Sequence, residues 1–202
     1  MKKAIQHLRA SDPVMAAIIE RVGAYKITYT EPVFHSLVRS ITYQQLNGKA
    51  ASTIFGRLLE AAKTDPLTPE SILKLRPQKM RALGLSRQKL TYIRDLARLT
   101  KAGEVNFELC ATLEDHHVVE HLTRVKGVGV WTVHMFLIFA LRRPNVLPTG
   151  DYGVRAAIKK AYGLSDLPKP AEMERIATAW HPYCSIASWY LWRSLENQGG
   201  AA

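Results

Sequence analysis

The chain has 202 residues, a formal net charge of +11 and 47% hydrophobic residues. This length suits one compact domain, or two small lobes that share a core, and the apolar content is that of a globular protein. No stretch approaches about 18 consecutive apolar residues, so no membrane-spanning helix is expected. The N-terminus has no apolar run of the kind found in signal peptides. Two cysteines, Cys110 and Cys184, are too few for a disulfide framework or for a four-cysteine zinc or iron–sulfur site. We therefore expect a reduced, cytoplasmic protein without an iron–sulfur cluster.

The positive charge is concentrated in two segments. Residues 79–101 carry seven basic residues and one acidic residue, and residues 120–160 carry seven basic and two acidic residues. The rest of the chain is electrically neutral. This distribution favours a polyanionic partner, most simply nucleic acid. The alternative is a basic protein whose charged helix faces are only solvated.

The hydrophobic periodicity is helical over almost the whole chain. Ser11-Asp12-Pro13 and Thr30-Glu31-Pro32 are helix-start signals, and Gly84 and Gly103 mark helix ends. The predicted helices cover residues 13–22, 32–46, 48–62, 68–75, 77–84, 87–102, 115–124, 130–142, 152–162, 170–179 and 183–197. The one strand-like stretch, 25–29, is too short to build a sheet. The sequence therefore predicts an all-α protein of about ten helices.

A glycine-containing turn joins two of the predicted helices. Glycines such as Gly127 and Gly129 permit positive φ angles and close approach of another backbone. The amides that begin the following helix favour an anion, so a DNA phosphate can bind there without any contact to a base. An ordinary helix–helix turn is the alternative. Apolar and basic residues flank the glycines and strengthen the phosphate interpretation: Leu122, Val125, Val128, Arg124 and Lys126.

Several segments together resemble one family. Residues 122–132 resemble a helix–hairpin–helix, and Asp151 follows within 146–155 at the spacing of a helix–hairpin–helix–Gly/Pro–Asp signature. Residues 40–51, with their Gln-Gln-Leu run, and 83–97, with Leu-Gly-Leu-Ser, fit the same pattern. The chain thus resembles the DNA glycosylases of this superfamily over about residues 30–195. The resemblance is to their alkylation-repair branch, the 3-methyladenine DNA glycosylases.

The resemblance implies a fold and an activity. The fold is two helical lobes with a cleft between them: lobe 1 is about 1–32 plus 145–202, and lobe 2 is about 33–144 and contains the helix–hairpin–helix, 115–142. The activity is base excision repair by a monomeric, monofunctional enzyme. It would act on double-stranded DNA containing alkylated purines, such as 3-methyladenine or 7-methylguanine, and leave an abasic site. Two alternatives stay open: a non-catalytic helix–hairpin–helix DNA-binding module, and a glycosylase for another damaged or mismatched base.

The chemistry is assigned to two residues. Asp151 is the catalytic candidate, because a carboxylate stabilises the oxocarbenium character of the sugar and orients or deprotonates the attacking water. Its local alternative is a helix N-cap, a role that Thr149 could fill instead. Trp131 lies where family members that also nick the strand have a Schiff-base lysine. A tryptophan cannot attack the sugar, which implies water as nucleophile, and Lys126 is a poor substitute. The Trp131 indole would face a cationic alkylated base, a contact of about 1–2 kcal/mol when desolvated; a buried core aromatic is the alternative.

The remaining candidates follow from position or from the resemblance. Met135 and Tyr183 are expected to line the base pocket with Trp131, whereas Trp180, Trp189 and Trp192 have the spacing of packing residues. The predicted phosphate-binding residues are Gly127, Gly129, Lys126, Val128 and Thr132. The candidates for the wedge that fills the gap left by the flipped base are Gln45, Leu46 and Asn47, with a helix corner capped by Asn47 as the alternative. The resemblance also implies a Na⁺ or K⁺ ion on the backbone carbonyls of Thr123, Val125 and Val128, and no required cofactor.

Overall fold

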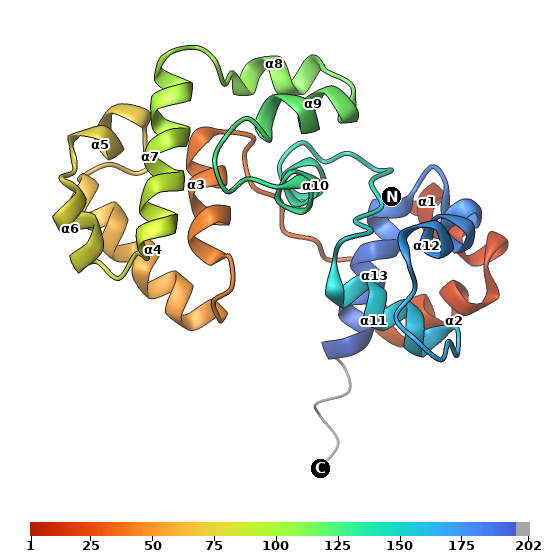
Figure 1. Ribbon diagram of the computed structural model, residues 1–202. Helices are drawn as coiled ribbons and strands as arrows, with labels where there is room; N and C mark the ends of the chain where they lie inside the picture. The colour runs from red at the N-terminus through yellow and green to blue at the C-terminus, as the bar shows by residue number, and fades with distance from the viewer. Residues whose placement is uncertain (197–202) are drawn as a thin grey trace. The chain divides into compact units, whose positions relative to one another are not determined.

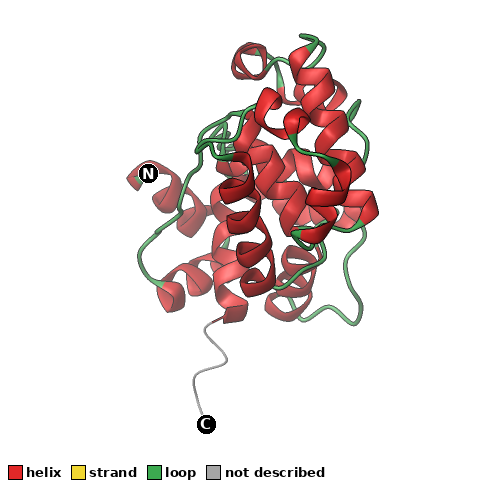
Figure 2. Ribbon diagram, turned by 90° about the vertical axis from the view of Figure 1, so that its left-hand side faces the viewer, coloured by secondary structure: helices red, strands yellow, loops and turns green. Residues whose placement is uncertain are grey.

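The structure, a computed structural model, describes residues 1–196. Within these residues every regular element is a helix and none is a strand, which confirms the all-α prediction (Figure 2). The chain divides into two compact units. Unit 1 comprises Met1–Tyr29 and the chain from Leu137 onward, and unit 2 comprises Thr30–Phe136.

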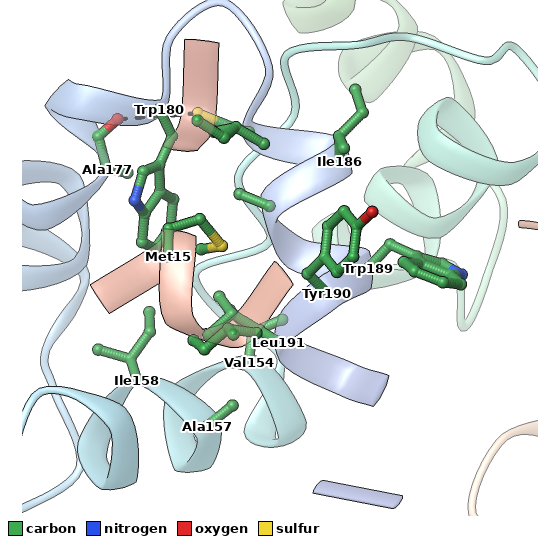
Figure 3. Close-up of a cluster of buried hydrophobic side chains, with 14 of the residues drawn as sticks. Met15, Val154, Ala157, Ile158, Ala177, Trp180, Ile186, Trp189, Tyr190 and Leu191 are labelled. Atoms are coloured by element: carbon green, nitrogen blue, oxygen red, sulfur yellow. Dashed lines mark hydrogen bonds between the residues drawn. The ribbon is translucent and has the colours of Figure 1, made fainter. Parts of the chain in front are cut away.

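Unit 1 is built around its C-terminal helix. Its elements are α1 (Lys2–Ser11), α2 (Pro13–Val22), α11 (Tyr152–Ala161), α12 (Pro170–Ala177), the 3₁₀ turn η1 (Thr178–Trp180) and α13 (Cys184–Glu196). Helix α13 packs against α2 and α11, and its Tyr190 and Leu191 are fully buried in the core (Figure 3). Met15 of α2 lies beside Trp180 in the same cluster. Burial of these side chains joins the two ends of the chain in one core.

A buried carboxylate strengthens this joint. Asp12 caps α2 by accepting the amides of Val14 and Met15 at 2.9 and 3.1 Å. Its other oxygen accepts the Tyr162 hydroxyl and the Trp180 indole N–H, the latter at 2.8 Å. Because a buried charge needs hydrogen-bond partners, Asp12 fixes α2 against segments far along the chain.

Unit 2 is organised by its longest helices. Its elements are α3 (Phe34–Tyr43), α4 (Gly48–Ala62), α5 (Pro69–Lys74), α6 (Pro77–Ala82), α7 (Arg87–Lys101), α8 (Phe107–Thr112), α9 (Asp115–Leu122) and most of α10 (Val130–Phe139). Helix α7 lies between α3 and α5 and also contacts α6 (Figure 1). Side-chain caps begin α4, α5 and α7 at Asn47, Thr68 and Ser86, as these residue types predict.

The structure differs from the predicted helices in physically understandable ways. Helices α1 and α8 were not predicted: α1 begins at Lys2 after Met1, which provides no side-chain cap, and α8 is only six residues long, too short for a periodic pattern. The predicted helix 32–46 is confined to Phe34–Tyr43, and the predicted helix 130–142 ends at Phe139. The units divide at Thr30 and Leu137, where the sequence predicted lobe boundaries near 33 and 145. The second division therefore falls inside α10.

None of the helices within residues 1–196 is both long enough and apolar enough to span a membrane.

Candidate active site and nucleic-acid interface

The predicted hairpin is the turn between α9 and α10. Helix α9 ends at Leu122 and α10 begins at Val130. Val125 and Val128 are 1% and 4% exposed, and the Val128 amide donates to the Val125 carbonyl at 3.1 Å. The two valines anchor the turn in unit 2, so Val128 can offer a ligand only its backbone.

The two glycines of the hairpin have different roles. Gly127 has φ +75°, and a Cβ there would lie 2.1 Å from Cδ2 of Tyr92. The neighbour that excludes a side chain is thus an aromatic ring of α7, not another backbone. At Gly129 no atom lies within 4 Å of the corresponding Cβ position, and no positive φ is required. Gly129 therefore leaves open space at the surface of the turn.

The first turn of α10 presents its side chains in two directions. Trp131 is 42% exposed, so its interpretation as a buried core aromatic is wrong. Met135, one turn further along the same helix, is half-buried. Thr132 is 3% exposed, and its hydroxyl accepts a hydrogen bond from Gln44 Nε2 at 3.2 Å. The Thr132 hydroxyl is thus engaged by Gln44, and the assignment of Thr132 to phosphate binding stays a prediction.

Lys126 has one polar group that is engaged within unit 2 and one that is exposed. Its side chain is at the exposed turn, whereas its backbone N–H donates to Oδ2 of Asp95 at 2.9 Å. Only the ammonium group can therefore contribute to binding an anion.

The short loop between α3 and α4 carries the predicted wedge residues. Asn47 Oδ1 accepts the Ala50 amide at 2.8 Å, so Asn47 is the N-cap of α4 and its side chain is occupied. Leu46 is 39% exposed, and Gln45 is exposed with φ +55°. Of the three candidates, Gln45 and Leu46 are the ones whose side chains are at the surface without this capping role.

Asp151 is both a helix cap and a buried carboxylate. It is 8% exposed, and its Oδ1 accepts the Val154 amide at 2.8 Å, so Asp151, and not Thr149, caps α11. The same oxygen accepts the indole Nε1–H of Trp192 at 2.8 Å. Two N–H donors from different helices thus fix the plane of the carboxylate.

The hydrogen bond from Trp192 to the catalytic candidate Asp151 is a contact that the sequence interpretation missed. The helical spacing of Trp192 predicts a packing residue, and its ring does stack on Phe139 with centroids 5.7 Å apart. Gly153 permits the indole to approach, because a Cβ at that position would lie 3.0 Å from Trp192 Cδ1. The glycine two residues after Asp151 was a local signal of a close neighbour. The identity of that neighbour, 41 residues away from Asp151, was not visible in the sequence.

Tyr183 belongs to unit 1 and packs against its core. It is partly buried, and its ring meets that of His7 edge-to-face with centroids 5.4 Å apart. Its assignment to a base pocket stays a prediction.

Much of the basic segment 79–101 is engaged inside unit 2. Arg81 and Arg94 donate to the carbonyls of Leu85 and Leu75, and Lys89 donates to two carbonyls at the end of α3. Arg98 pairs with Asp95 and Glu104. These four of the seven basic side chains stabilise the unit, so fewer basic groups of the segment are available for direct contact with a nucleic acid than its composition suggested. The hydrogen bonds to carbonyls leave the positive charge itself unchanged.

Within residues 1–196, no cluster of three or more His, Cys, Asp or Glu side chains could hold a metal ion. Cys110 and Cys184 are buried, and burial raises the pKa of the two thiols to about 11 and about 12.

The α9–α10 hairpin places the chain in the class of helix–hairpin–helix proteins, in which such a turn meets the nucleic-acid backbone. The family model described as "HhH-GPD superfamily base excision DNA repair protein" matches residues 38–182. The chain belongs to this superfamily.

Known proteins of the superfamily match over most of their length. DNA-3-methyladenine glycosylase 1 of Schizosaccharomyces pombe is 32% identical over 200 residues, which are 96% of this chain and 87% of the relative. A solved structure of a 3-methyladenine DNA glycosylase of that organism, in complex with abasic DNA, has a TM-score of 0.84 at 32% identity, covering 94% of this chain and 95% of the other. A DNA-3-methyladenine glycosidase of Bacillus halodurans has a TM-score of 0.86 at 32% identity, covering 97% and 90%.

Proposed function

We propose that this protein is a monofunctional DNA glycosylase of base excision repair that hydrolyses the N-glycosidic bond of alkylated purines in double-stranded DNA. The products are the free base and an abasic site. The observation that carries the proposal is the carboxylate of Asp151, 8% exposed and held by the Val154 amide and the Trp192 indole. Family membership and the 3-methyladenine glycosylases among the relatives support it.

Asp151 acts on the sugar. As the bond from C1′ to the purine breaks, its electron pair leaves with the base, and positive charge develops on the deoxyribose. A fixed carboxylate stabilises this charge without reorganising during the reaction. Water forms the new bond to C1′, and Asp151 orients that water and accepts its proton.

Trp131 selects the base. Alkylation at N3 or N7 makes a purine cationic, and such a base leaves as a neutral molecule, so little acid catalysis is needed. A partly exposed indole offers the face on which a cation is attracted. Met135, half-buried on the next turn of α10, extends this apolar surface, and Tyr183 is the further aromatic proposed for the pocket.

Trp131 also determines the reaction type. A tryptophan has no amine to form a Schiff base, and the nearby Lys126 belongs to the turn proposed to bind phosphate. Water is therefore the nucleophile, and the strand stays intact after the base is released.

The hairpin binds the DNA backbone. The open space at Gly129 admits a phosphate to the first amides of α10, and the exposed Lys126 ammonium adds positive charge. A Na⁺ or K⁺ ion on the carbonyls of Thr123, Val125 and Val128 fits this role, because the Val125 carbonyl accepts one hydrogen bond and has a second lone pair. The enzyme acts as a monomer, and Leu46 or Gln45 fills the space left by the flipped nucleotide.

The experiment that tests the proposal uses duplex DNA alkylated at purines. After incubation with the protein, heating in alkali should break the strand at each abasic site, whereas samples without alkali should stay intact. Breaks without alkali would contradict the monofunctional assignment. Binding without excision of N3- or N7-methylpurines would favour a non-catalytic hairpin module, and release of only mismatched or oxidised bases would favour the other glycosylase class.

A further inference from the structure

The α3–α4 loop, residues 44–47, is hydrogen-bonded to the hairpin turn, residues 123–129. Gln44 Nε2 donates to the Gly127 carbonyl at 3.1 Å and to the Thr132 hydroxyl at 3.2 Å. A single side chain at the start of the loop therefore contacts both the turn and the first part of α10. The loop that carries the wedge candidates and the turn that binds phosphate are thereby joined directly.

Helix α7 binds both segments with one stripe of side chains. Lys89, Tyr92 and Asp95 are spaced three residues apart and so lie along the same side of the helix. Lys89 Nζ donates to the carbonyls of Thr42 and Gln44 at 2.7 and 2.6 Å. The Tyr92 ring packs on Gly127, and Asp95 accepts the Lys126 amide.

The hydrogen bonds from Lys89 to the end of α3 belong to a strong class. Its ammonium meets carbonyls at the C-terminal end of α3, where the helix dipole is negative, and hydrogen bonds from a charged donor are the stronger class. Directly after these carbonyls, Gln45 takes φ +55°, a conformation unfavourable for a residue with a side chain. Such a conformation persists only where surrounding contacts fix it, and Lys89 and Gln44 provide them.

We propose that Gln44 and Lys89 are positioning residues for base flipping. Through them, the position that the hairpin takes on the DNA backbone determines where the side chains of Gln45 and Leu46 enter the duplex. This inference rests on the proposed glycosylase function and adds the physical link between phosphate binding and the wedge. Neither residue needs to touch the reacting atoms.

The decisive variant is Gln44→Glu, which keeps the shape of the side chain but replaces the donating Nε2 with an oxygen that repels the Gly127 carbonyl. Gln44→Ala removes the contact without adding charge, and Lys89→Met removes the two bonds to the end of α3. Gln78→Glu, at an exposed position of α6, is the control for the added negative charge. Thermal melting of each variant establishes that the compared proteins are folded.

Two duplex substrates distinguish an effect of these variants on base flipping from an effect on bond cleavage. One duplex has 7-methylguanine opposite cytosine, and the other has it opposite thymine, where the lesion leaves the stack at lower cost. At saturating protein, Gln44→Glu and Lys89→Met should lower the single-turnover excision rate about tenfold on the paired lesion and less than about threefold on the mispaired lesion. Gln78→Glu should change neither rate. Equal losses on the two duplexes, or no loss on the paired one, would overturn the positioning role.

A second measurement tests, independently of catalysis, whether the contacts of Gln44 link the hairpin to the insertion of the wedge residues. With 2-aminopurine placed next to an abasic site, insertion of the wedge unstacks the probe and raises its fluorescence. Saturating wild-type protein should produce a larger rise than Gln44→Ala, while both bind the duplex. Equal fluorescence would overturn the coupling. A wild-type protein that excises neither lesion would contradict the proposed function, and the fluorescence comparison would still decide this inference.

Discussion

The indole N–H of Trp192 donates to the Asp151 oxygen that also accepts the Val154 amide, both at 2.8 Å. The carboxylate is therefore fixed by its own helix and by α13. Asp12 shows the same combination in the same unit, capping α2 while it accepts the indole N–H of Trp180. The two aspartates offer a matched comparison between a carboxylate with a proposed catalytic role and a structural one.

Replacing Asp151 with Asn should lower the excision rate by about 10²–10³-fold or more, because the negative charge that stabilises the sugar is lost. Asn retains an oxygen that can cap α11, so melting temperature and affinity for undamaged DNA should change little. Single-turnover kinetics on an alkylated duplex measure the effect. Asp12→Asn should show the reverse: about 1–3 kcal/mol of lost stability, with a near-normal rate for the folded fraction. A near-normal rate for Asp151→Asn would refute the catalytic assignment.

Trp192→Phe should keep the aromatic packing against Phe139 and remove only the donor to Asp151. Without this donor, the carboxylate is less well oriented, and the single-turnover rate should fall about tenfold at unchanged DNA affinity. Trp189→Phe, in the same helix but packed against Tyr25, is the control and should not lower the rate of the folded enzyme. Equal rates for wild type and Trp192→Phe would show that the indole N–H has no part in catalysis.

Alanine substitutions at the two hairpin glycines should have separable effects. Gly127→Ala forces a methyl group into the Tyr92 ring at a positive φ angle, so it should destabilise the fold by at least about 1–3 kcal/mol. Gly129→Ala meets no protein atom, so it should leave the melting temperature unchanged and weaken binding to DNA of any sequence. Denaturant unfolding and binding to undamaged duplex measure the two effects. Unchanged DNA affinity in Gly129→Ala would contradict a phosphate at this turn.

Trp131→Ala should discriminate between cationic and neutral lesions. Loss of the indole face removes about 1–2 kcal/mol of attraction for a cationic base, so excision of 7-methylguanine should fall by about 5–30-fold. Excision of a neutral base such as hypoxanthine should fall less, since it lacks the charge. Trp131→Phe should retain part of the preference. Equal losses on the two substrates would mean that Trp131 provides shape without cation recognition.

Stability should decrease as the pH falls below about 6.5, the usual pKa of histidine. Burial lowers the pKa of His121, with a smaller contribution from the charge of Arg124, and burial also lowers the pKa of His134. The unfolded chain therefore binds more protons than the folded one as the pH falls through this range, which favours unfolding. In the folded protein His121 Nε2 accepts a hydrogen bond from the Asn106 amide at 3.0 Å, and protonation of Nε2 removes this acceptor.

Unfolding free energies at pH 7.5 and 5.5 measure this effect. His121→Gln, which does not titrate, should reduce the pH dependence, while His116→Gln, at an exposed position of the same helix, should retain it. The same pH dependence in all three proteins would exclude His121 as its source.

Local sequence signals predicted most of the helices because the residues that begin and end helices act on their own neighbours. Asp12 and Pro13 begin α2, Asn47 caps α4, and Ser86 caps α7 as predicted. Local signals did not predict the end of a helix that depends on a contact with a residue far along the chain. Helix α3 ends at Tyr43, earlier than its apolar pattern indicated, and Lys89 of α7 binds the carbonyls of Thr42 and Gln44 on either side of this end.

The sequence by itself determined the helical class and the turn at residues 122–132, because spacing along one chain is enough to show a turn between two helices. The choice of Asp151 and Trp131 followed from the resemblance of this turn and its flanking segments to a known family. Only the tertiary structure decided which side chains are available for binding. It exposed Trp131, turned the Thr132 hydroxyl inward, occupied Asn47 with a cap and joined Trp192 to Asp151. Sequence patterns report neighbours within a few residues, whereas burial and long-range hydrogen bonds depend on which helices pack together. The net charge of +11 can be counted from the sequence alone. That Arg81, Lys89 and Arg94 donate to backbone carbonyls follows only from the packing of the helices.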